Sequence, residues 1–209
     1  MHKLFCLLIL ALCAGCATKL PGEFQFESSQ KNGPVGGPYN ALHLTIDVNA
    51  LQLANTFGMD RDGLITQVND RLSKAFVKKF AEANVAVKVK IVDLRSEVTQ
   101  SGNTTTTKTF TRTPQEIFAG VEPRNQRALM IHISRYQQSN SQWTGLVGWE
   151  LKLVDPSAWV NDPNQQLWRG KTSLMQFGQA ACGPDAYVTC ADRFADAVVT
   201  QLRAEQIVK

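Results

Sequence analysis

The chain has 209 residues and a mass of 23.1 kDa, which is enough for one or two domains. Hydrophobic residues make up 44% and charged residues 19%, so a buried core is feasible and a self-repelling disordered chain is excluded. The formal net charge of +4 is small and scattered, unlike the clustered basic face of a nucleic-acid-binding protein. No interior stretch supplies the roughly 20 apolar residues of a membrane-spanning helix.

The N-terminus has the organisation of a secretory signal. Lys3 precedes an apolar run over residues 4–12, which is too short to cross a bilayer. The run leads into Ala14-Gly15-Cys16, which resembles the lipobox of bacterial lipoproteins, where signal peptidase II cuts before a cysteine that carries diacylglycerol. Cys13 stands where that motif usually has Leu, and an ordinary signal peptide cut nearby is the alternative.

The lipobox resemblance implies a domain organisation. Residues 1–15 would be removed as a signal peptide, and Cys16 would carry lipid that holds the chain on a membrane. Ala17 points to the outer membrane, because Asp at that position tends to retain enteric lipoproteins at the inner membrane. Residues 16–40 are rich in Gly and Pro with few apolar side chains, so a flexible tether is expected there. Residues 41–209 would then form a periplasmic domain.

The remaining cysteines fit an oxidising compartment. Once the signal is removed and Cys16 is acylated, only Cys182 and Cys190 are left, and we expect them to form a disulfide. A redox pair and half of a zinc site are the alternatives. Redox motifs favour a Cys-x-x-Cys spacing, and this region lacks two further zinc ligands.

The first part of the domain alternates strand and helix patterns. Residues 42–48 alternate apolar and polar side chains, which predicts a half-buried strand. Apolar residues then recur every four positions from Leu64 to Phe80, which predicts an amphipathic helix over about 60–83 that stops at Asn84. A second one-faced strand is predicted over 85–91, where valines alternate with lysines.

A threonine-rich segment follows, with eight threonines between Thr99 and Thr113. Threonine favours strands, so a solvated hairpin that turns at Ser101-Gly102-Asn103 is one interpretation. A mobile loop is the other, because the segment has almost no apolar residues.

The last third predicts three more strands and a helix. The strands are expected over 127–136, 143–154 and 167–175, with turns at Asp155-Pro156 and over 161–164. A closing helix is expected over about 191–208, since Phe194, Val198 and Leu202 recur at steps of four.

The sequence has none of the common catalytic or cofactor signatures. It lacks a nucleophile elbow, a zinc-protease helix motif, a phosphate-binding glycine loop and a dinucleotide fingerprint. His43 and His132 fall within strands, at positions expected on the solvent side or at a sheet edge, and they would meet only if their strands adjoin. We therefore predict no enzyme activity, no metal and no cofactor.

The sequence offers several candidate contact residues. Lys88 and Lys90, together with Arg95, Lys108 and Arg112, would make a basic stripe on an open sheet face for anionic lipid, lipopolysaccharide phosphates or an acidic partner. The alternative is an ordinary solvated strand face.

Two further contact zones are suggested by composition. Trp159, in a Pro- and Asn-rich loop, is the tryptophan expected to be exposed, although a loop Trp can also pack locally. Thr104 and Thr107 represent the threonine-rich segment as the second candidate zone.

The order strand, long helix, strand, polar hairpin, strands and closing helix resembles the small periplasmic domains of several lipoprotein families. These include the TolB N-terminal-like domain, which is shared in outline with the curli-secretion lipoprotein, and the auxiliary lipoproteins of lipid-transport ABC systems. The strand around Leu129 to Ile133 carries a Leu-x-Ile-x-Ile pattern of the kind that precedes a meander and closing helix in those proteins. The resemblance covers most of 41–208 and is topological.

Together these observations predict one α+β domain, with a mostly antiparallel sheet and two helices packed on one face. The expected function is a non-catalytic, lipid-anchored accessory or assembly component of an envelope complex, on the periplasmic face of the outer membrane. Its partners would be the membrane, through the N-terminal lipid, and an envelope protein, with no nucleic acid. A lipid or small-molecule carrier is the alternative, and a cell-wall enzyme is a third.

Overall fold

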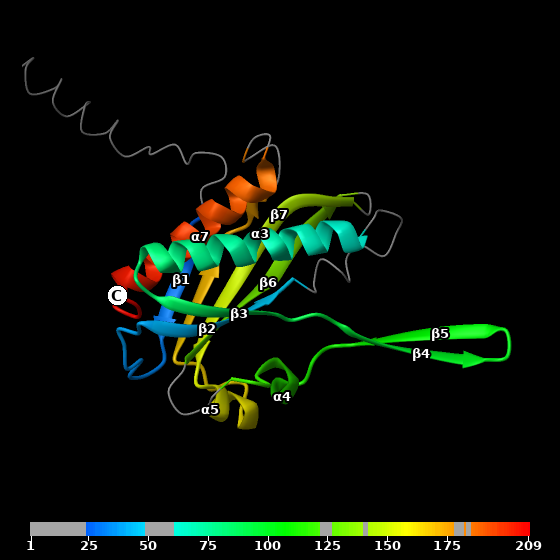
Figure 1. Cartoon of the computed structure of the whole chain (residues 1–209). Helices are drawn as coiled ribbons and strands as arrows, with labels where there is room; N and C mark the ends of the chain where they lie inside the picture. The colour runs from blue at the N-terminus through cyan, green and yellow to red at the C-terminus, as the bar shows by residue number, and fades with distance from the viewer. Residues whose placement is uncertain (1–23, 49–60, 122–126, 140–141, 178–181, 183–184) are drawn as a thin grey trace, which may run out of the picture.

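The structure is a computed structural model that describes residues 24–48, 61–121, 127–139, 142–177, 182 and 185–209 (Figure 1). The signal and lipidation site predicted at residues 1–16 lie outside the described residues. In chain order the elements are β1 (Phe26–Lys31), β2 (Ala41–Asp47), α3 (Arg61–Glu82), β3 (Ala86–Ile91), β4 (Arg95–Ser101), β5 (Thr104–Phe110), α4 (Pro114–Ile117), β6 (Arg127–Ser139), β7 (Gln142–Val154), α5 (Pro156–Asn161), β8 (Trp168–Thr172), β9 (Met175–Gln176) and α7 (Ala186–Ala204).

The main sheet is mixed. Its strands run in the order β1-β8-β7-β6-β2-β3, and the short β9 pairs with β7. β2 is parallel to both neighbours, β3 and β6, whereas the other pairs are antiparallel. The predicted α+β class is therefore confirmed. β3 can be parallel to β2 because α3 connects the two strands and returns the chain to the end of the sheet where β2 begins.

The helix α3 follows from its apolar stripe. Val68, Leu72, Phe76 and Phe80, spaced four apart, are all fully buried, so the stripe lies on one face of the helix. The helix ends just before Asn84, whose φ of 57° is in the left-handed region that asparagine tolerates. The predicted helix and its stop are confirmed.

The main core lies between α3, α7 and one face of the sheet (Figure 1). Alternate residues of β6 and β7 point into it, and the aromatic rings fill its centre. Phe194 of α7 stacks on Trp149 with ring centroids 4.6 Å apart, and it meets Phe76 of α3 edge-on at 5.6 Å. Burial of these rings supplies much of the free energy that holds the helices to the sheet.

A smaller apolar cluster lies on the opposite face. Ala128 and Val154 alternate with core residues along β6 and β7, and Phe118, Val121 and Trp159 cover them. Trp159 is only 8% exposed and meets Phe118 edge-on at 5.3 Å. The prediction that Trp159 is exposed is therefore wrong, because its loop folds into α5, capped by Asp155, and turns the ring inward.

The predicted tether over 16–40 is wrong for its described part. β1 pairs antiparallel with β8 over Phe26–Lys31 and forms one edge of the main sheet. Lys31 donates a hydrogen bond from Nζ to the carbonyl of Glu205, 2.6 Å away. An edge strand needs few apolar side chains, and most of β1 is exposed, so composition alone suggested a linker.

The predicted cysteine pair is confirmed. Cys182 and Cys190 stand at disulfide distance, with Cα atoms 5.5 Å apart and a sequence separation of 8. Both side chains are buried against the main core, so the link ties the first turns of α7 to the segment that precedes it.

Candidate functional site

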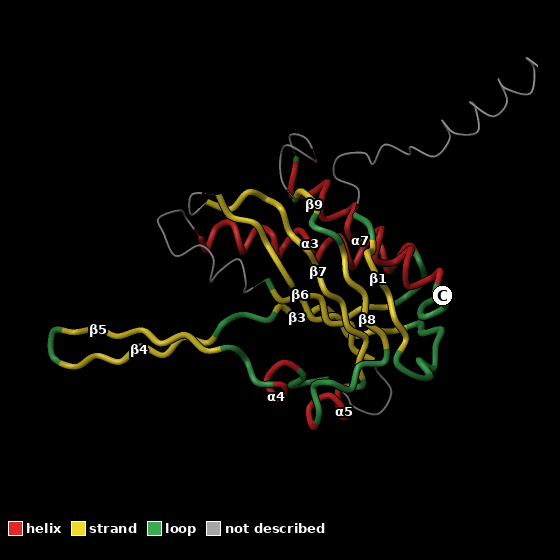
Figure 2. Tube along the Cα trace, turned by 180° about the vertical axis from the view of Figure 1, so that it is seen from behind, coloured by secondary structure: helices red, strands yellow, loops and turns green. Residues whose placement is uncertain are grey.

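The hairpin β4–β5 projects from the body as a separate two-stranded sheet (Figures 1 and 2). Its register is unbroken from Arg95 opposite Phe110 to Ser101 opposite Thr104. The two-residue loop between the strands includes Gly102 at a φ of +58°, the left-handed conformation that tight hairpin turns require. Of the two interpretations of the threonine-rich segment, the structure adopts the hairpin.

The hairpin is exposed along its length. All of its described side chains are exposed, including Thr104, and Val98 is 66% exposed. Thr107 stands opposite Val98 in the backbone register, and Glu97 stands opposite Lys108. Among the described residues, no other strand pairs with either outer edge of the hairpin. Such edges present unpaired backbone N–H and C=O groups to solvent, which suits them to pair with another chain.

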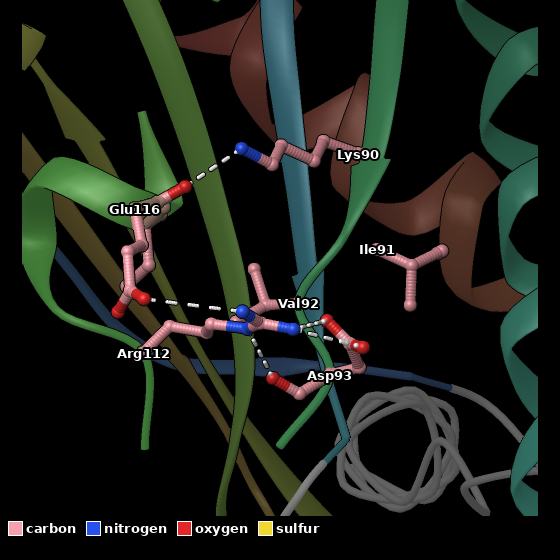
Figure 3. A pocket seen from close by; sticks show the side chains of 7 residues that line it. Lys90, Ile91, Val92, Asp93, Arg112 and Glu116 are labelled. Atoms are coloured by element: carbon pink, nitrogen blue, oxygen red, sulfur yellow. Dashed lines mark hydrogen bonds and ion pairs between the residues drawn. The ribbon is translucent and has the colours of Figure 1, made fainter. Parts of the chain in front are cut away.

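A charged clamp closes the base of the hairpin (Figure 3). Arg112 follows β5, and its guanidinium donates to both carboxylate oxygens of Asp93, at 3.0 and 3.1 Å, and to the Asp93 carbonyl at 3.1 Å. Asp93 lies between β3 and β4, so this charge-assisted pair joins the two ends of the projecting segment. Arg112 also lies 3.9 Å from a carboxylate oxygen of Glu116.

The short helix α4 braces the same neck. Thr113 caps it, accepting from the Glu116 N–H while the Glu116 carboxylate accepts from the Thr113 N–H, which is a complete capping box. Lys90 of β3 donates to the carbonyls of Glu116 at 2.8 Å and Ala119 at 3.2 Å. These contacts border a pocket of about 250 Å³, below the roughly 300–1,000 Å³ of typical ligand sites.

The predicted basic stripe is divided among different roles. Lys88 is exposed on β3, whereas Lys90 bonds to α4 and Arg112 to Asp93. Lys108 lies on the hairpin, away from the sheet. Sequence reasoning grouped these residues because it could not place the hairpin apart from the sheet.

A buried carboxylate on the open sheet face is the centre of a charged cluster that was not predicted from the sequence. Glu150 of β7 lies 2.8 Å from Nε2 of His132 and 3.3 Å from Nζ of Lys152, and it also pairs with Arg169 of β8. Burial raises the pKa of Glu150, but Lys152, the Arg169 hydrogen bond and the charges of His132 and Arg169 outweigh it and hold that pKa below its usual value. Burial, and then Lys152, lower the pKa of His132, and they outweigh Glu150 and Asp47, which raise it.

His43 was expected on a solvent-side or edge position, and it is neither. It lies on β2, an interior strand between β6 and β3, and is 2% exposed, with neither ring nitrogen hydrogen-bonded by any described group. Burial, Lys88 and Lys90 lower its pKa. His43 stands opposite Ala128 of β6, whereas His132 stands opposite Asp47, so the two histidines do not pair although their strands adjoin.

Metal-binding clusters and membrane-spanning helices are both absent from the part of the chain that the structure describes. No group of three or more His, Cys, Asp or Glu side chains there is arranged to hold a metal ion. No helix in the described ranges is both long and apolar enough to cross a membrane.

Comparisons with known proteins add little. No protein-family model and no curated protein matches the sequence. One solved structure with some likeness is a dodecamer of a single-residue variant of PelC from Paraburkholderia phytofirmans, at 11% identity and a TM-score of 0.30, covering 82% of this chain and 99% of that one. A TM-score this low supports no conclusion about this chain.

Proposed function

We propose that this chain is a non-catalytic, lipid-anchored accessory or assembly component of a cell-envelope complex. It would sit on the periplasmic face of the outer membrane, held by acylated Cys16, and residues 41–209 would act as one domain with both long helices on one face of the sheet. The observation that carries the proposal is the projecting two-stranded hairpin of β4 and β5. Through these strands the chain would contact its partner.

The hairpin favours a contact role for a physical reason. A lone two-stranded hairpin is marginally stable in water, and this one buries none of its described side chains. The clamp between Arg112 and Asp93 nevertheless fixes where it leaves the body. An arm that gains so little from its own contacts is explained by a partner that adds strand pairing to its open edges.

The filled core favours this function over a carrier. A carrier would need an apolar groove between helices and sheet, and aromatic rings occupy that space in the described residues, with Phe24 in contact with both Phe177 and Phe194. The pocket at the neck is small and bordered by charged groups. The carrier alternative therefore has no specific observation in its favour, and neither does a cell-wall enzyme.

The test is a shortened hairpin. Replacing residues 97–108 with Asn-Gly keeps Arg95, Phe110 and the Arg112 clamp, and it removes most of the arm. Crosslinking in membranes followed by co-purification should then lose the envelope partner, while the melting temperature stays as in the unaltered chain. A matched control is Lys74→Ala on the exposed side of α3, which should retain the partner. Undiminished co-purification of the shortened chain would overturn the proposal.

The anchor has its own test. Cys16→Ser should abolish metabolic labelling with palmitate and release the protein from membranes, whereas Cys182→Ser should leave the label unchanged. Persistent label in the Cys16→Ser protein would contradict lipidation at this residue.

A further inference from the structure

The position of the first described residues limits where a lipid anchor can lie. The Phe24 ring packs against Phe177 and Phe194, with centroids 6.2 and 5.1 Å away. The Gln25 carbonyl accepts a hydrogen bond from the Ser173 N–H at 3.2 Å. The chain is therefore already fixed to the body at residue 24.

Only a short stretch separates this point from the proposed anchor. Cys16 precedes Phe24 by eight positions, so even a fully extended chain spans no more than about 29 Å between them. The end of the body where Phe24 lies, which we call the anchor end, would consequently be held near the lipid surface. Tethering at such a range raises the effective concentration of surface and body to the millimolar scale, so weak contacts suffice to keep them together.

Large apolar side chains are exposed at this same end. Leu174, Tyr136 and Val188 are 39%, 37% and 38% exposed. Leu174 directly follows Ser173, the residue that bonds to Gln25. The other large apolar side chains exposed in the described residues are Val77 on α3 and Val98 and Phe110 on the hairpin.

The short strand β9 brings the three side chains to one place. Met175 of β9 pairs with Val147, which in turn pairs with Tyr136. On the other side, Sγ of Cys190 lies 4.0 Å from the carbonyl oxygen of Gln176, and Val188 is two positions earlier on α7. Figure 2 shows β9 beside the start of α7. The exposed residues therefore lie on elements next to β9, and Leu174 adjoins the point where Gln25 is held.

We propose that the anchor end rests directly on the bilayer that holds acylated Cys16, with Leu174, Tyr136 and Val188 in contact with lipid. This inference depends on the proposed lipid anchoring. Transfer of apolar side chains from water to the boundary between headgroups and acyl chains is favourable. Aromatic residues such as Tyr are enriched at the membrane–water interface. A second copy or a protein partner on the same surface is the competing occupant, and the experiment distinguishes it.

The experiment places a fluorescent label at single sites of the full-length acylated protein. The variants are Leu174→Cys and Val188→Cys, with Val77→Cys and Val98→Cys as controls, each labelled with nitrobenzoxadiazole. Cys16 is acylated and the other cysteines are paired, so the new thiol is the one labelled. The proteins are reconstituted in phosphatidylethanolamine–phosphatidylglycerol vesicles with and without nitroxide-bearing lipid.

Quenching by the nitroxide lipid should be several-fold stronger at positions 174 and 188 than at 77 and 98. Equal quenching at all four sites, or strongest quenching at 98, would overturn the inference. Shielding of 174 and 188 in the unacylated Cys16→Ser protein, in buffer without lipid or detergent, would also overturn it, and would identify a protein as the occupant. Hydrogen exchange of the unlabelled chain, with amides 173–176 slowed by vesicles, tests the same contact without any substitution.

Failure here is separable from failure of the proposed function. If palmitate labels Cys16 and the partner co-purifies, but no site is quenched, the body stands away from the bilayer and the proposed function is unaffected. If Cys16 is not labelled, the anchor itself is absent and both proposals fail.

Discussion

The body and the hairpin are ordered by different forces. In the body, Phe76, Trp149 and Phe194 are enclosed between helices and sheet, so tertiary burial fixes their positions. In the hairpin, cross-strand pairing and the strand preference of threonine maintain the structure, and charged contacts at the neck set its direction. Changes in the body should therefore alter stability, and changes in the hairpin should alter binding.

The largest expected effect lies in the main core. Phe76→Ala removes a fully buried ring that contacts Phe80 and Phe194, so the free energy of unfolding should fall by about 3–5 kcal/mol. Urea unfolding measures this loss. The control Lys74→Ala changes an exposed side chain on the same helix and should stay within about 0.5 kcal/mol. A Phe76→Ala protein that unfolds like the unaltered chain would mean that α3 is not held by burial.

The cysteine pair comes next. Replacing both Cys182 and Cys190 with Ser frees an eight-residue loop in the unfolded chain and should lower stability by about 2–3 kcal/mol. Replacing both avoids an unpaired buried thiol. Adding reductant to the unaltered protein should lower its free energy of unfolding toward that of the double variant. No effect of reductant would mean that the pair is not a disulfide.

Acid should weaken the open face of the sheet without involving the hairpin. The pKa values of His43 and His132 are lowered, so the folded state binds these protons more weakly than the unfolded state. The stability that depends on these two neutral histidines is present above about pH 6.5 and declines as the pH falls below that value. Glu150, whose pKa is also lowered, stays ionised until the pH falls below its ordinary value of about 4.3.

Urea midpoints at about pH 7.5 and about pH 5.5 test this dependence on the histidines. The unaltered chain should lose stability between the two, and a chain with His43→Gln and His132→Gln should lose less. An equal loss in both proteins would show that other groups carry the acid sensitivity.

The smallest effect on stability is expected in the hairpin. Val98→Ser removes an exposed apolar side chain, so unfolding should change by no more than about 0.5 kcal/mol. Partner association should weaken nonetheless if the hairpin is the contact arm. A large loss of stability would contradict the separation between body and hairpin.

The sequence predicted the elements whose side chains repeat regularly. The period of four in α3 and the alternation in β6 and β7 were sufficient, since the main core takes one stripe of the helix and alternate residues of the strands. The strand predicted over 42–48 forms β2, but the prediction that it is half-buried is wrong, because both of its faces are buried. β1 was not predicted because it is an exposed edge strand whose partner β8 lies far along the chain. The helix α4 had a local signal, the spacing of Thr113 and Glu116, that marks a capping box.

The contact residues were harder to predict than the elements. Trp159 was judged by its Pro- and Asn-rich neighbours, although Asp155-Pro156 is also a helix start, which is what forms there. The surroundings of Glu150 depend on the register among three strands, which places His132 and Arg169 beside it. Register of this kind is long-range and leaves no mark in the local sequence.

The pairing of β1 also affects how the chain can acquire its structure. Its bonding partners in β8 come late in the sequence, and the Lys31 ammonium bonds to the carbonyl of a residue 174 positions later. Similarly, the Tyr39 N–H donates to the Ile207 carbonyl at 2.8 Å. A chain delivered N-terminus first therefore presents this strand long before its partners arrive. This edge of the sheet cannot close before β8 is available, and until then β1 is open to chaperones and to mispairing with other chains.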